Sequence, residues 1–151
     1  MKVMIIMGST SDMTVMEESK KWLNWFGIES EIVVASAHRN ADKVSELMKG
    51  AANNGFGAVI AGAGMAAALP GVCAALTPLP VIGVPLDGGL PGGIDALYSI
   101  VQMPAGVPVA TMAVGKAGAR NAAVLCARMF ALSNTDLQEK LYAFAEQGYK
   151  I

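Results

Sequence analysis

The sequence predicts an α/β fold: a three-layer α/β/α sandwich built on a doubly wound, mainly parallel sheet of five strands. Strand-like and helix-like segments alternate along the chain, which is the order expected when helices connect parallel strands. The strand candidates are short, continuous apolar runs, which is typical of strands that helices bury on both faces. Turns rich in glycine and serine follow several of these runs, at the edge where such sheets bind ligands.

Apolar runs bounded by turn residues predict the five strands. The first lies at the amino terminus and leads into Gly8-Ser9, and the second follows Gly27, a residue that ends helices. The predicted strands are Val3–Met7, Glu29–Ala35, Ala58–Ala61, Val81–Val84 and Val107–Met112.

Helices are predicted between and after these strands. Ser11 is a candidate N-cap for a helix that runs to about Phe26 and stops at Gly27. Apolar residues at helical spacing, such as Val44 and Met48, predict an amphipathic helix after the second strand. This second helix is predicted at Asn40–Asn53, and three more are predicted at Ala66–Leu76, Ala117–Leu132 and Asp136–Gln147. We therefore expect residues 1–151 to form a single α/β domain with a C-terminal helix over about 135–147.

Composition and charge exclude several classes of function. Hydrophobic residues make up 54% of the chain and charged residues 15%, so part of the surface is expected to be buried between subunits. The net charge of −1 argues against nucleic acid as a partner, because that would need a basic face. Gly, Pro or polar residues interrupt every apolar stretch before it reaches the length needed to span a membrane. The apolar segment Met1–Met7 is too short for a signal peptide. We expect a cytoplasmic protein with no membrane partner, in which Cys73 and Cys126 are reduced core thiols.

Four turns at the carboxyl ends of predicted strands are expected to meet at one edge of the sheet. They are Gly8-Ser9-Thr10-Ser11-Asp12, Ser36-Ala37-His38-Arg39, Gly62-Ala63-Gly64-Met65 and Pro85-Leu86-Asp87-Gly88-Gly89.

The first of these turns is a candidate ribonucleotide site. The turn Gly8-Ser9-Thr10-Ser11-Asp12 lies between a predicted strand and a predicted helix, where it offers hydroxyls and free backbone N–H groups at a helix N-terminus. Taken alone, such a turn is more simply explained as a serine-rich helix cap. It is neither a Walker loop nor a dinucleotide-binding fingerprint. Asp12 suits a ribose diol, and Arg39 from the next strand end supplies positive charge for a phosphate. A phosphorylated ribose is the predicted ligand.

His38 is the only histidine in the chain and follows the second strand directly. A histidine at a strand end beside a cation suits proton transfer, whereas His38 taken alone is better explained as a surface or core histidine without a catalytic role. The glycines of Gly62-Ala63-Gly64 allow backbone to approach a ligand closely, and tight packing of helix on sheet explains them equally well.

Taken together, the segments resemble the carboxyaminoimidazole ribonucleotide mutase family of purine biosynthesis over nearly the whole chain. The matching segments are Met7–Asp12, Ser36–Arg39, Ala61–Gly64, Leu69–Gly71, Pro80–Pro85 and Ser99–Pro104. The resemblance implies a homo-octamer that uses no metal or organic cofactor. It also implies an isomerase that moves the carboxyl group of N5-carboxyaminoimidazole ribonucleotide from nitrogen to a ring carbon. By matching position, His38 is the expected proton-transfer group. The expected substrate-binding residues are Ser9, Ser11, Asp12, Ser36, Arg39 and Gly64.

The chain departs from the family pattern in the third turn. Class I relatives, the mutases, usually read Gly-Ala-Gly-Gly-Ala-Ala-His-Leu-Pro-Gly, where this chain has Met65 for a glycine and Ala68 for the histidine. Arg39 favours class I, because class II relatives tend to carry lysine there. The alternatives are a class II carboxylase, a lyase that uses aminoimidazole ribonucleotide and carbon dioxide directly, and a ribonucleotide-binding protein without catalysis. The flavodoxin- or Rossmann-like fold class also permits an electron carrier.

Overall fold

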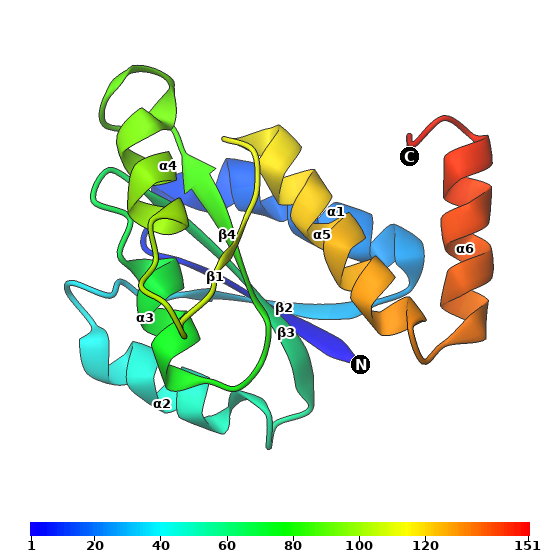
Figure 1. The fold of residues 1–151 in the computed structure, drawn as a ribbon, viewed down its shortest axis with the longest axis horizontal. Helices are drawn as coiled ribbons and strands as arrows, with labels where there is room; N and C mark the ends of the chain where they lie inside the picture. The colour runs from blue at the N-terminus through cyan, green and yellow to red at the C-terminus, as the bar shows by residue number, and fades with distance from the viewer.

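The computed structural model describes all 151 residues and places a five-stranded, wholly parallel sheet at the centre of the molecule (Figure 1). The strand order is β2-β1-β3-β4-β5. The strands are β1 (Lys2–Met7), β2 (Glu29–Val34), β3 (Phe56–Gly64), β4 (Val81–Leu86) and β5 (Ala110–Thr111). The predicted α/β class and the five parallel strands are confirmed, although β5 is much shorter than the predicted Val107–Met112.

Helices cover both faces of the sheet and make the outer two layers (Figure 1). Helices α1 and α5 pack side by side on one face, and α2, α3 and α4 cover the other. The helices are α1 (Met13–Phe26), α2 (Ala41–Ala51), α3 (Leu69–Leu76), α4 (Ile94–Val101), α5 (Lys116–Ala131) and α6 (Thr135–Glu146). None of them is long and apolar enough to span a membrane.

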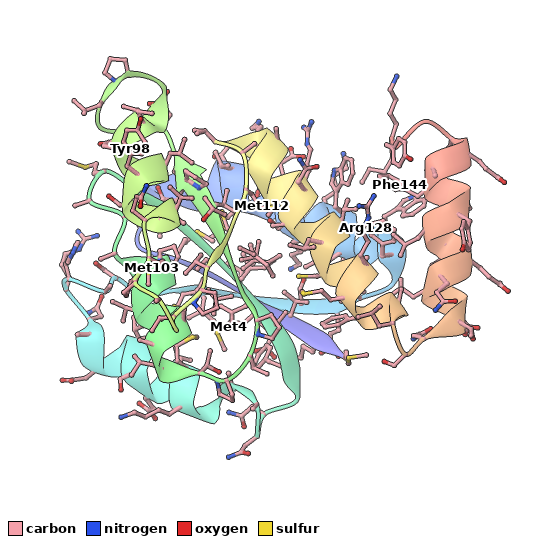
Figure 2. The ribbon with its side chains drawn as sticks, viewed as in Figure 1. Met4, Tyr98, Met103, Met112, Arg128 and Phe144 are labelled. Atoms are coloured by element: carbon pink, nitrogen blue, oxygen red, sulfur yellow. The ribbon has the colours of Figure 1, made fainter.

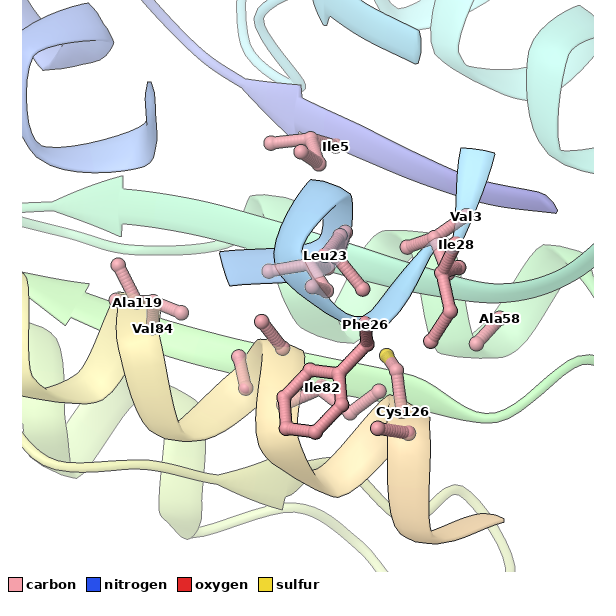
Figure 3. Packing of buried hydrophobic residues seen from close by; sticks show 14 of the residues in the cluster. Val3, Ile5, Leu23, Phe26, Ile28, Ala58, Ile82, Val84, Ala119 and Cys126 are labelled. Atoms are coloured by element: carbon pink, nitrogen blue, oxygen red, sulfur yellow. The ribbon is translucent and has the colours of Figure 1, made fainter. Parts of the chain in front are cut away.

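The continuous apolar strands are explained by two separate cores. Along β1, Val3 and Ile5 point into the core beneath α1 and α5, whereas Met4 and Ile6 point into the core beneath α2, α3 and α4. Figure 3 shows the first of these cores, in which Leu23 and Phe26 of α1 pack against the sheet. Because successive side chains of a strand alternate between its faces, burial on both faces leaves no position for a polar residue.

Helix α6 packs outside the three layers against α5 and the end of α1 (Figure 1). Phe144 points from α6 toward α1 (Figure 2), where its ring makes edge contacts with Trp22 at 5.6 Å and Phe26 at 5.3 Å between centroids. The Lys140 Nζ donates a hydrogen bond of 3.0 Å to the carbonyl of Phe26. An aromatic cluster and a hydrogen bond to the end of α1 therefore hold this helix.

The two cysteines are free core thiols, as predicted. Cys73 lies in the core beneath α2, α3 and α4, and Cys126 lies in the core beneath α1 and α5. Burial raises the pKa of both thiols to about 12, which keeps them protonated and unreactive at neutral pH.

Two local predictions were wrong. Ser11 does not cap α1: a single 3₁₀ turn over Thr10–Asp12 comes first, Ser9 caps that turn, and Asp12 is the first residue before α1. Helix α3 begins at Leu69 rather than Ala66, because the residues before it form the turn that leaves β3.

Helix α4 was not predicted at all. Its apolar residues Ile94, Leu97, Tyr98 and Val101 have helical spacing, but they directly follow the helix breakers Pro91-Gly92-Gly93. The helical spacing of these apolar residues was the one signal in the sequence that could have revealed this helix.

The register places the carboxyl ends of four strands at the same edge of the sheet. Met7 pairs with Val34 of β2 and with Gly62 of β3, and Gly62 pairs in turn with Val84 of β4. The chain leaves β1 for β2 on one side and crosses to β3 on the other, so the topological switch point lies at β1. The four predicted turns therefore meet around that point.

Candidate active site

A cleft of about 690 Å³ lies at this edge, a size typical of small-molecule sites. All four turns line it, together with the start of α3. The lining residues are Gly8, Ser9, Ser11, Asp12, Ser36, Ala37, His38, Arg39, Ala63, Gly64, Met65, Ala66, Ala68, Leu69, Leu86, Asp87 and Gly88. All seven residues predicted for the site therefore line one cleft, although their roles stay predictions.

The turn after β1 presents two hydroxyls and a carboxylate to the cleft. The Ser11 backbone N–H donates to Ser9 Oγ at 3.3 Å, which fixes the 3₁₀ turn. Ser11 Oγ lies 2.9 Å from Ser9 Oγ and 3.3 Å from Asp12 Oδ1, so the Ser11 hydroxyl donates its hydrogen bond to one of these two oxygens at a time. The hydroxyls are held close together with spare hydrogen-bonding capacity, which suits polar groups on a sugar.

The surroundings of Asp12 raise the pKa of its carboxyl. Partial burial raises the pKa of its carboxyl above the ordinary value, against smaller lowering effects of hydrogen bonds from the Ser11 side chain and the Ser9 backbone. The carboxylate makes no capping hydrogen bond to α1, although Asp12 stands at the N-cap position. A desolvated carboxylate that does not stabilise its own helix is a candidate for contact with a ligand.

The turn after β2 carries His38 and Arg39. Ser36 is buried, and its Oγ accepts a 3.3 Å hydrogen bond from the Arg39 backbone N–H, which stabilises the turn. The side chains of His38 and Arg39 are exposed at the cleft. The Arg39 Nη2 donates at 3.2 Å to the carbonyl of Gly8, across from β2 to β1. Its other N–H groups make no hydrogen bond within the chain and are free to bind an anion.

The far end of the cleft, at β3 and β4, is mostly apolar. Ala63, Ala66, Ala68, Leu69 and Leu86 form this wall, with Asp87 as its one charged residue. The two leucines were not singled out from the sequence, because nothing distinguishes a leucine in a site wall from one in the core. The chain holds no cluster of three or more His, Cys, Asp or Glu side chains arranged to bind a metal ion.

Gly64 lies on the cleft and is also constrained by packing. A Cβ added there would stand 3.2 Å from the carbonyl oxygen of Leu86 on the neighbouring strand. Tight packing thus accounts for this glycine, and its contact with substrate stays a prediction.

Comparison with known proteins gives a consistent set of relatives. Residues 2–150 match the AIR carboxylase family. The N5-carboxyaminoimidazole ribonucleotide mutase of Mycobacterium tuberculosis is 49% identical over 146 residues, which is 97% of this chain and 83% of the relative. The mutase of the same name from Escherichia coli K12 is 46% identical over 140 residues, which is 93% of this chain and 83% of the relative. The crystal structure of Treponema denticola PurE aligns with a TM-score of 0.86 and 30% identity, over 98% of this chain and 91% of that one.

Proposed function

The chain belongs to the AIR carboxylase family, and from this premise we propose that it is an N5-carboxyaminoimidazole ribonucleotide mutase, an isomerase of purine biosynthesis. Relatives that are 46–50% identical over most of the chain carry that name, which favours the mutase over direct carboxylation.

The observation that carries the proposal is the division of the cleft into a charged end and an apolar end. Arg39 and Asp12 lie on the β2 and β1 turns, where a phosphate and a ribose are bound by a guanidinium and a carboxylate. The apolar wall at β3 and β4 suits the flat imidazole ring of the substrate and the neutral carbon dioxide that the substrate releases. His38, at the cleft and beside Arg39, supplies the proton-transfer group.

The reaction needs protons to move but consumes none. The substrate nitrogen takes a proton while its bond to the carboxyl carbon breaks, and carbon dioxide is released into the cleft. The electron pair of the ring carbon then attacks that carbon dioxide, and the same ring carbon loses its proton. His38 can give the first proton and accept the second, so one imidazole serves both half-reactions.

We expect the carbamate substrate to be consumed at low bicarbonate, because its own carboxyl group supplies the carbon dioxide. The change in imidazole absorbance measures this with purified protein. The control reaction offers aminoimidazole ribonucleotide with dissolved carbon dioxide. Strict dependence on added carbon dioxide, with no conversion of the carbamate, would contradict the proposal and indicate a direct carboxylase.

An octamer is part of this proposal. The outer side of α4 and the loop before it expose Leu90, Ile94, Tyr98 and Val101 at helical spacing. Figure 2 shows Tyr98 on α4. Arg39 is the only lysine or arginine in the cleft wall, and it faces a substrate with both a phosphate and a carboxylate. Burial of the apolar stripe between copies, with further charge from a neighbour, accounts for both observations. Light scattering should give eight times the chain mass, and a monomer at micromolar concentration would refute this assembly.

We place the enzyme in the cytoplasm. Its proposed substrate and product are phosphorylated, and charged molecules of this kind do not cross a membrane unaided.

A further inference from the structure

Asp95, in the first turn of α4, holds the loop that joins β4 to α4 (Figure 1). Its Oδ2 accepts a 3.1 Å hydrogen bond from the Leu90 backbone N–H. Gly89 leaves room for this contact, because a Cβ built on Gly89 would overlap Asp95 Oδ2. The carboxylate therefore lies directly against the backbone of the loop.

The part of the loop next to the cleft depends on this one hydrogen bond. Neither Gly88 nor Gly89 makes a hydrogen bond within the chain, and glycines without such bonds change conformation easily. Asp95 fixes the peptide unit between Gly89 and Leu90. The Gly93 N–H, which donates to the Leu90 carbonyl at 3.0 Å, fixes only the following peptide unit. Asp95 is thus the group that restrains the two glycines.

The second oxygen of the same carboxylate is buried without a partner. No group of the chain donates a hydrogen bond to Asp95 Oδ1. Asp136 is likewise the second residue of its helix, α6, and it is exposed, so the attraction of a carboxylate to a helix N-terminus does not require burial. Because an unpaired buried oxygen destabilises a fold, the burial of Asp95 indicates a role beyond stability.

The restrained loop forms one wall of the cleft. Asp87 and Gly88 line the cleft beside Leu86, at the β4 end. His38 lines it from the turn after β2, and β1 and β3 lie between β2 and β4 in the sheet. The β4–α4 loop and the His38 turn therefore lie on opposite sides of the space in which a ring would bind.

We propose that Asp95 is a positioning residue that fixes the β4–α4 loop as the wall against which the imidazole ring of the substrate rests. This inference rests on the proposed mutase function. His38 can exchange protons with the substrate only within hydrogen-bond reach, and a displacement of about 1 Å can lower a rate by about 100-fold. A wall that contains two unbonded glycines keeps its position only if another group holds it.

Three substitutions separate the hydrogen bond from the charge and from packing. Asp95→Ala removes the acceptor, and Asp95→Leu removes the acceptor but fills the space. Asp95→Asn removes the charge and keeps an oxygen that can accept from the Leu90 N–H. Asp136→Ala is the matched control, because it removes a carboxylate from the same position of a helix that does not line the cleft.

The experiment measures turnover of the carbamate substrate, thermal unfolding, and calorimetric binding of the product and of ribose 5-phosphate. Ribose 5-phosphate has no imidazole ring, so it reports on the charged end of the cleft alone. We expect Asp95→Ala and Asp95→Leu to lower kcat by about 10- to 100-fold and to weaken binding of the product. Both variants should bind ribose 5-phosphate as tightly as the wild type. Asp95→Asn and Asp136→Ala should stay within a few-fold of wild type.

The outcomes separate this inference from the function it rests on. Wild-type turnover in both the Ala and Leu variants, or equal losses of affinity for the product and ribose 5-phosphate, would show that Asp95 does not position the ring. A loss in Asp95→Asn as large as in Asp95→Leu would also overturn the proposal, because the retained hydrogen bond would then have no effect. A wild-type protein that converts no carbamate substrate would refute the mutase function, and the two binding measurements would then decide the role of Asp95 alone.

Discussion

Replacing His38 with asparagine should abolish turnover and leave ribonucleotide binding largely intact. The amide retains much of the shape and some of the hydrogen bonding of the imidazole, but it cannot take and release a proton near neutral pH. Loss of acid–base catalysis lowers the rate by about 10²–10⁴-fold. His38 is the only histidine of the chain, so no second imidazole can replace it. Steady-state rates and calorimetric binding of the product measure the two effects separately.

The fold of the His38→Asn variant should be unchanged, because His38 is exposed and makes no hydrogen bond within the chain. A wild-type unfolding temperature therefore serves as the control. Rates within a few-fold of wild type would show that another group transfers the proton. A loss of binding as large as the loss of rate would instead indicate that His38 only holds the substrate.

The fold was predictable because its signal is repeated in the three central strands, β1, β3 and β4, whereas the neighbouring strand β2 exposes Glu29 and Glu31. Continuous apolar runs such as Val3–Met7 are explained only by burial on both faces, and the sheet places one face in each of two cores. Helix α4 was missed because its pattern covers only eight residues behind Pro91-Gly92-Gly93. The cap of α1 was misassigned because four polar residues in a row, Ser9–Asp12, offer the same chemistry at each position, and only the 3₁₀ turn selects Ser9.

The place of the polar side chains in the cleft was also predictable, since they follow β1 and β2, whose carboxyl ends must meet; their roles stay predictions. The family resemblance carried by these segments is confirmed by the match over residues 2–150. The apolar end was not predictable in the same way. Leu69 and Leu86 have the residue type of the core, and the left-handed backbone of Met65 cannot be recognised from its sequence neighbours.

Replacing Arg39 with alanine should weaken binding of the ribonucleotide and barely change binding of the dephosphorylated nucleoside. A guanidinium donates charge-assisted hydrogen bonds to phosphate, and their loss costs about 1.5–3 kcal/mol, which is about 10- to 150-fold in affinity. The free N–H groups of Arg39 point to this role, since its one hydrogen bond within the chain is to the Gly8 carbonyl. Calorimetry with the two ligands measures the difference.

Arg39→Lys separates charge from geometry in the same assay. Lysine keeps the positive charge but loses the planar fork that binds two phosphate oxygens at once, so its affinity should fall between those of alanine and arginine. The hydrogen bond to Gly8 gives the competing explanation, in which Arg39 acts only by bracing the turns after β2 and β1. Bracing alone would weaken both ligands equally, because the ribose contacts of Ser9 and Asp12 would be disturbed with or without the phosphate. Equal losses would therefore assign Arg39 to the turn, and a loss confined to the phosphorylated ligand would assign it to the phosphate.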